Sequence, residues 1–137
     1  MSTKRAWGAA SIVAIALVLA GCSSEPIDPE LTSAVSSAIS SGASAQVGLE
    51  LSTRGRILPG TLTALLGDMA GDLADTERTL EMHQATDADD AQYRDEALSG
   101  VRASLEAVHV AQGGDQKAGL AGITASLDDL RALEHGL

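Results

Sequence analysis

The stretch that decides the fold is residues 62–83, LTALLGDMAGDLADTERTLEMH. Its apolar and weakly polar residues recur in alternating steps of four and three, and this series is Leu62, Leu66, Met69, Leu73, Thr76, Leu80 and His83. An α-helix places residues with this spacing on one face, whereas a β-strand would need a spacing of two. The stretch therefore predicts a long helix whose apolar seam packs against other helices.

Proline and glycine mark the boundaries of this helix and of the one before it. Pro59 predicts the start of the seam-bearing helix. Upstream, Asp28 and Pro29 predict a helix start, as the N-cap and the first helical residue, and Gly55 predicts the end of that helix after about residue 53. The face of this first helix consists of small and medium-sized residues, namely Leu31, Val35, Ala38, Gly42, Ala45 and Leu49.

Two further helices follow residue 83. Thr86 and Asp89 have the spacing of a capping pair and predict the start of a third helix, which ends at residues 113–114. Asp115 predicts the N-cap of a fourth helix that ends at Gly136. The expected core faces of these two helices are Leu98, Val101, Leu105 and Val108, and then Leu120, Ile123, Leu127, Leu130 and Leu133.

Four helices of similar length joined by short turns fold most simply as an antiparallel bundle. We therefore expect an all-α domain over residues 29–137, with up-down-up-down topology. The chain contains no Phe, and its single Trp is Trp7, so the core must consist of Leu, Ala and Val. In this topology, residues 22–28, the turn between the second and third helices and the C-terminus share one end.

Residues 1–21 are typical of a targeting segment. Lys4 and Arg5 form a positively charged start, and residues 6–21 are mostly apolar or small. This apolar run is shorter than the roughly 20 residues that a membrane-spanning helix needs. A short apolar run with basic residues before it favours a secretory signal peptide that is removed from the mature protein.

The signal segment ends in Leu19, Ala20, Gly21 and Cys22, and this motif resembles the lipobox of bacterial lipoproteins. The resemblance implies that Cys22 receives a thioether-linked diacylglycerol and becomes the first residue after cleavage. It also implies a location at the cell membrane, facing outside the cytoplasm, because two acyl chains are enough for stable anchoring. Residues 22–28 then form a tether, whose six residues after the cysteine span about 20 Å at most.

Charge and composition exclude several classes of function. The net charge is −10, and all 19 acidic residues lie after position 21. Tyr93 is the only aromatic residue in that part of the chain, so neither a basic surface nor aromatic stacking faces are present for nucleic acid. No G-x-S-x-G motif and no phosphate-binding loop occur, and we expect a non-enzymatic protein without a cofactor.

We therefore expect a binding or structural module of the cell envelope, with an envelope protein as its partner. Arg54 and Arg56 lie in the turn between the first and second helices, at the end opposite the tether. Arginine is enriched at binding hot spots, so this pair is the predicted partner-binding site.

A small metal- or haem-binding bundle is the alternative. His83 and His135 end the second and fourth helices and so share one end of the bundle, whereas His109 lies about 30 Å away along the third helix. Met82 and the acidic turn at residues 87–90 lie near this pair. Imidazoles with carboxylates suit a borderline metal cation, and His or Met side chains are axial ligands of haem iron.

Overall fold

Four helices account for most of residues 25–137, the part of the chain that the computed structural model describes. They are α1 (Pro29–Thr53), α2 (Pro59–Met82), α3 (Ala88–Gln112) and α4 (Gln116–His135). The predicted all-α four-helix bundle is thereby confirmed. The predicted signal peptide, the lipobox residues Leu19, Ala20 and Gly21, and the lipidation site Cys22 lie outside the described residues.

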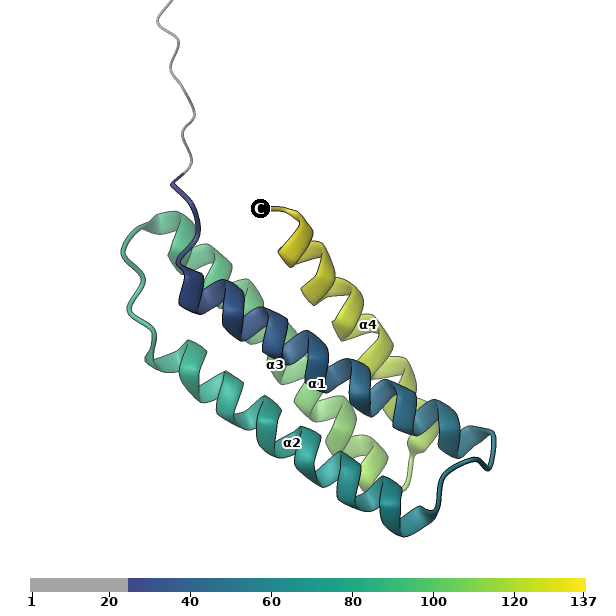
Figure 1. Cartoon of the computed structure of the whole chain (residues 1–137). Coiled ribbons are helices and arrows are strands. Elements are labelled where there is room, and N and C mark those ends of the chain that lie inside the picture. The colour runs from purple at the N-terminus through teal and green to yellow at the C-terminus, as the bar shows by residue number, and fades with distance from the viewer. Residues whose placement is uncertain (1–24) are drawn as a thin grey trace, which may run out of the picture.

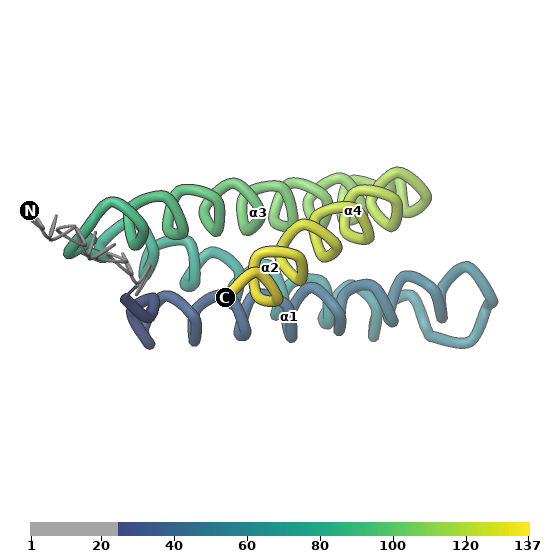
Figure 2. Tube along the Cα trace, turned by 90° about the horizontal axis from the view of Figure 1, so that it is seen from above, coloured from purple at the N-terminus to yellow at the C-terminus, as the bar shows by residue number. Residues whose placement is uncertain are grey.

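The helices run antiparallel, and each packs against the helices before and after it in the chain (Figure 1). Contacts between α1 and α4 close the ring, so that α2 and α4 occupy opposite corners. Residue 25, the α2–α3 loop and the C-terminus lie at one end, which we call the tether end. The α1–α2 and α3–α4 turns lie at the other, which we call the distal end. Figure 2 shows α4 starting beside α3 and crossing obliquely toward α1.

Three of the four helices begin at an aspartate whose carboxylate accepts a hydrogen bond from a backbone N–H of the first turn. These caps are Asp28 with Glu30 (2.8 Å), Asp87 with Asp90 (2.8 Å) and Asp115 with Ala118 (2.9 Å). A carboxylate is favoured here because the N-terminal N–H groups lack partners and carry partial positive charge. Gly55 and Gly114 have φ of 64° and 109°, a backbone region that other residues adopt at a cost, and they make the two distal turns possible.

The expected capping pair of α3, Thr86 with Asp89, is wrong by one residue. Asp87 is the N-cap, and its carboxylate binds the N–H of Asp90. Thr86 instead donates its hydroxyl hydrogen to Oδ2 of Asp90, at 2.8 Å. A charged carboxylate next to the helix terminus replaces the hydroxyl as the cap, because it is the stronger acceptor at a site of positive potential.

The predicted seams of α1 and α2 form one half of the core. All six predicted residues of the α1 face are buried. In α2 the four leucines of the seam are at most 4 % exposed, Thr76 is buried and Met69 is partly buried. The residues with four-three spacing thus face the core along the full length of both helices.

The faces between α3 and α4 differ from the expected ones. Val101 and Val108 are buried as expected, but Leu98 and Leu105 are only partly buried. The closest packing comes from small residues, which are Ala97, Gly100, Ser104, Ala107 and Ala111 on α3 and Gly119, Gly122 and Ser126 on α4. The Ser104 hydroxyl donates to Oγ of Ser126 at 2.8 Å, and the Ser126 hydroxyl donates to the carbonyl oxygen of Ile123 at 3.1 Å, so both buried hydroxyls are hydrogen-bonded.

None of the helices within residues 25–137 combines the length and the hydropathy that crossing a lipid bilayer requires. 

Replacing Gly119 by alanine should destabilise the bundle. A Cβ atom built at Gly119 would lie 2.5 Å from Cβ of Ala111 and 2.9 Å from the carbonyl oxygen of Ala107, and these groups cannot rotate away. We expect the free energy of unfolding to fall by about 1–3 kcal/mol, the typical cost of overpacking, as measured by urea denaturation.

Gly71→Ala is the matched control, because Gly71 lies within α2 and a Cβ atom there meets nothing within 4 Å. Alanine at such a position should raise the free energy of unfolding by roughly 0.5–1 kcal/mol. Equal stability of the two variants would contradict the close approach of α3 and α4.

Candidate functional site

Three chain segments meet at the tether end in a polar cluster, which we call the His83 cluster. Asp28 precedes α1, His83 follows α2, and Asp90 lies in the first turn of α3. One potential ligand atom of each residue lies within 4.8 Å of those of the other two. The side chain of His83 is 5 % exposed and Asp90 is 3 % exposed, whereas the side chain of Asp28 is 31 % exposed and faces the surface.

Asp90 joins the start of α1 to the start of α3. Its Oδ1 accepts a hydrogen bond from the backbone N–H of Asp28 at 3.0 Å, and its Oδ2 accepts one from the Thr86 hydroxyl. These bonds, the first above all, hold the pKa of the Asp90 carboxyl below its usual value, and the imidazole of His83 adds a smaller effect in the same direction. A buried carboxylate is tolerated here because both of its oxygens are hydrogen-bonded.

The two ring nitrogens of His83 have different surroundings. Nδ1 lies 3.2 Å from Oε2 of Glu30, which is hydrogen-bonding distance. Nε2 lies 3.8 Å from Oδ2 of Asp28, and it has no hydrogen-bond partner among residues 25–137. The backbone carbonyl of His83 accepts a hydrogen bond from Nη1 of Arg94 at 3.2 Å, and this bond fixes the chain where α2 ends.

The structure places the other predicted ligands outside this cluster. His135 is the last residue of α4 and is exposed, and it does not belong to the group of converging ligand atoms. Met82 borders the same surface hollow as His83, but it is 74 % exposed. The sequence-based alternative thus named His83 and, within the acidic turn at residues 87–90, Asp90, but it missed Asp28. The inward position of Asp90 could also have been predicted from the sequence. Counting backwards along α3 from Val101 through Ala97 in helical steps of four and three reaches Asp90, which places it on the core face.

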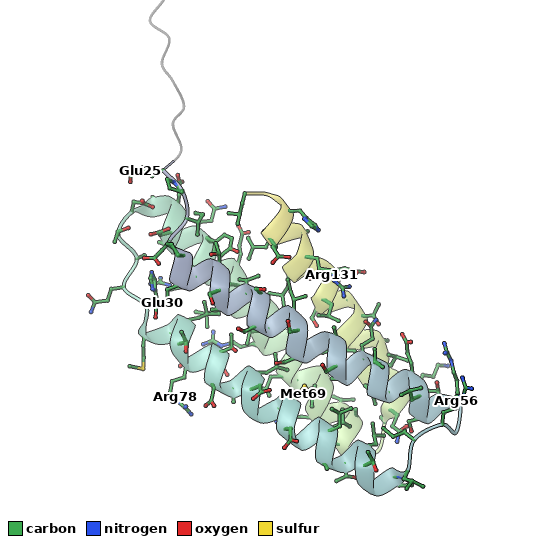
Figure 3. All side chains as sticks on the ribbon, in the orientation of Figure 1. Glu25, Glu30, Arg56, Met69, Arg78 and Arg131 are labelled. Atoms are coloured by element: carbon green, nitrogen blue, oxygen red, sulfur yellow. The ribbon has the colours of Figure 1, made fainter. Side chains whose placement is uncertain are left out.

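The distal end has the opposite charge. Most basic residues among residues 25–137 pair with a carboxylate within 4 Å, and these are Arg78, Arg94, Arg102 and Arg131. The three that form no such pair in this part of the chain are Arg54, Arg56 and Lys117, which are all exposed at the distal end and which we call the distal basic tip. Figure 3 shows Arg56 at the end of the bundle opposite Glu25 and Glu30. Leu58, in the same turn as the two arginines, is 74 % exposed.

A surface hollow of about 950 Å³ lies between α3, α4 and residues 25–27 at the tether end. Tyr93 lines it and is 5 % exposed, and its hydroxyl has no hydrogen-bond partner within residues 25–137. Burial, followed by the charge of Glu134, raises the pKa of this phenol. Carboxylates line the hollow beside apolar side chains and give it negative charge; these are Glu25, Asp89, Glu96 and Asp129.

Comparison of the chain with protein-family models, with curated proteins and with solved structures found no match. We therefore infer the function from the side chains at the two ends of the bundle. 

The lowered pKa of Asp90 predicts a loss of stability in acid. The folded state keeps this carboxyl ionised to lower pH than the unfolded state does. As the pH falls through the usual aspartate pKa of about 3.9, the unfolded chain therefore takes up a proton here before the folded chain does. The stabilisation is therefore present above that pH and is lost as the pH falls through the folded-state value. Urea midpoints measured between pH 6 and pH 2.5 should decline less steeply for Asp90→Asn than for the parent.

Asp89→Asn is the matched control, since Asp89 is exposed in the same helical turn. It should retain the parent's steep decline. If Asp90→Asn and the parent lose stability in parallel, the hydrogen bonds to Asp90 do not have the assigned effect.

Proposed function

We propose that this protein is a lipid-anchored lipoprotein of the cell envelope, whose helical domain is a non-catalytic module facing outside the cytoplasm. The domain binds a partner protein through the distal basic tip. The observation that carries the proposal is the position of the unpaired cations. Within residues 25–137 they gather at the end of the bundle farthest from residue 25.

The N-terminal motif supports the anchor. The lipobox resemblance assigns the lipid to Cys22, and Asp28 caps the first helix only six residues later. A tether of this length keeps the bundle within about 20 Å of the anchor point. With the tether at one end of an elongated bundle, the distal tip is the part of the domain that can extend farthest from the lipid.

The chemistry of the tip indicates an acidic partner surface. Arg54 and Arg56 present guanidinium groups that can bind carboxylates through two parallel hydrogen bonds, and exposed Leu58 adds an apolar contact. Elsewhere the domain is strongly acidic, so an acidic partner is repelled from its sides. Charge of opposite sign at one end thus selects the orientation of the complex as well as the partner.

Substitution of Cys22 by serine should release the protein from the membrane. Without the thiol no thioether to diacylglycerol can form, so we expect the processed chain to lose most of its membrane association in cell fractionation. Mass spectrometry of the parent should find residue 22 as a diacylglyceryl-modified N-terminus. A processed Cys22→Ser variant that fractionates with membranes as fully as the parent would show that the anchor is elsewhere.

The double substitution Arg54→Glu and Arg56→Glu should remove partner binding. A photo-crosslinking residue placed at position 58 reports neighbours of the tip in intact cells, and the adducts are identified by mass spectrometry. Loss of two charge contacts should lower the yield of the specific adduct at least about tenfold, because every 1.4 kcal/mol is tenfold in affinity.

The control carries Arg78→Glu and Arg131→Glu, which change the charge equally on the helix surfaces away from the tip. These two arginines already pair with aspartates three residues earlier in the chain. The adduct should persist in this control. An adduct yield that falls equally in both double variants would show that net charge, and not the tip, determines the interaction.

A further inference from the structure

We propose that the His83 cluster binds one first-row divalent metal ion, through Nε2 of His83 and one carboxylate oxygen each of Asp28 and Asp90. This site is separate from the distal basic tip and goes beyond the function proposed above. It stands on the same cluster geometry whether or not Cys22 carries a lipid.

The Nε2 atom of His83 is buried without a hydrogen-bond partner among residues 25–137. Since an ionised carboxylate can only accept hydrogen bonds, the contact of Nδ1 with Glu30 places a hydrogen on Nδ1. Nε2 then carries a lone pair when the ring is neutral, and the nearby Asp28 carboxylate cannot donate a hydrogen bond to it. When the ring is charged, Nε2 lies 3.8 Å from Oδ2 of Asp28, too far for a hydrogen bond. A metal ion would give Nε2 a bonding partner, whereas Nε2 has none in either the neutral or the charged form of the ring.

The distances fit a metal ion. Zinc binds histidine nitrogen at about 2.0–2.1 Å and carboxylate oxygen at about 2.0–2.2 Å. The distance of 3.8 Å between Nε2 of His83 and Oδ2 of Asp28 is shorter than two such bonds laid end to end. One possible ligand atom of each of Asp28, His83 and Asp90 lies within 4.8 Å of those of the other two, so the three side chains converge on one point and reach a common ion after small inward movements.

The neighbours of the ligands are those that a metal site requires. A metal-binding histidine usually donates the hydrogen of its other ring nitrogen to a carboxylate, which fixes the orientation of the ring, and Glu30 occupies this position. The carboxylates are held as well, because Oδ1 of Asp28 accepts from the Glu30 N–H and both oxygens of Asp90 accept hydrogen bonds. Each carboxylate oxygen has a second lone pair for a metal.

Charge and access also favour a cation. Asp28, Glu30 and Asp90 carry three negative charges around the ring of His83. Two guanidinium groups lie nearby, and both bind other groups. Arg94 binds the backbone of His83 through Nη1 and the carboxylate of Asp95 through Nε and Nη2, and Arg78, which lines the same surface hollow as His83, pairs with Asp75. An open hollow of about 790 Å³, lined by Asp28, Glu30 and His83, connects the cluster with solvent and provides an entry path.

The donor set selects among metals. One imidazole nitrogen with carboxylate oxygens suits zinc and its first-row neighbours, whereas magnesium and calcium prefer oxygen ligands alone. Haem fits poorly, because the carboxylate of Asp28 occupies the space in front of Nε2 where iron would lie. We therefore take Zn²⁺ as the probe and Mg²⁺ as the comparison ion.

Calorimetric titration of the full chain in detergent micelles tests the site. The parent should bind one equivalent of Zn²⁺, and millimolar Mg²⁺ should not displace it. His83→Gln and Asp28→Asn should each weaken Zn²⁺ binding at least tenfold. Asparagine is as good an N-cap as aspartate, so Asp28→Asn removes a charged ligand while retaining the cap of α1.

Matched controls lie at the distal end of the same bundle. Asp115→Asn makes the same exchange at the N-cap of α4, and His109→Gln replaces an exposed histidine of α3. Both variants should bind Zn²⁺ as the parent does. Equal binding by all four variants, or no binding by the parent at millimolar Zn²⁺, would overturn the proposal.

Nitrogen-15 NMR of the histidine rings gives a second test that needs no variant. Zn²⁺ should shift the Nε2 resonance of His83 strongly and leave its Nδ1 protonated. If both nitrogens of His83 carry hydrogens at pH 7 and Zn²⁺ moves neither resonance, His83 is a cation held among three carboxylates and no metal site exists.

Discussion

The scarcity of aromatic side chains is the constraint on which this bundle depends. Tyr93 is the only aromatic residue among residues 25–137, so the helices pack through aliphatic and small side chains and approach each other closely where the small ones meet. Dispersion energy falls steeply with distance, so an interface of small residues, such as the one between α3 and α4, is stable only if the backbones come near enough for their atoms to touch. Gly119 and Ala111 show this contact directly. Where α4 turns away from α3, the same lack of bulk leaves the hollow beside Tyr93.

Polar and charged contacts, and not apolar packing alone, shape the tether end of the bundle. At the tether end, Asp90 takes a position on the inward face of α3 where a leucine or alanine would otherwise pack, and the N–H of Asp28 provides one of its hydrogen bonds. Three segments distant in sequence are thus joined by polar contacts, in addition to the burial of apolar residues such as Leu31 and Leu80. Such contacts are specific in direction and depend on charge, which makes this end sensitive to protons and cations in a way that the leucine seam is not.

Much of the fold could be predicted because large aliphatic residues with a regular spacing identify a buried face without knowledge of the partner helix. The faces of α1 and α2 are of this kind. The α3–α4 interface could not be predicted in the same way, because Gly100, Ser104 and Ala107 are common on exposed helix faces too, and only the tertiary contact shows that they are buried. At the candidate site, His83 followed from the seam that it ends. Asp28 was explained as a helix cap and Asp90 as part of the acidic turn near His83, and the contact between them depends on the packing of α1 against α3.

The hydrogen bond between Asp28 and Asp90 has a mechanical consequence. Any pulling force applied to the chain ahead of residue 25 enters the folded domain at Ile27, which packs against the core, and at Asp28, which is bonded to Asp90 of α3. The load is thereby shared between α1 and α3 before the first turn of α1 can unwind. Asp28, which begins the domain, therefore also protects the first turn of α1 against unwinding under load.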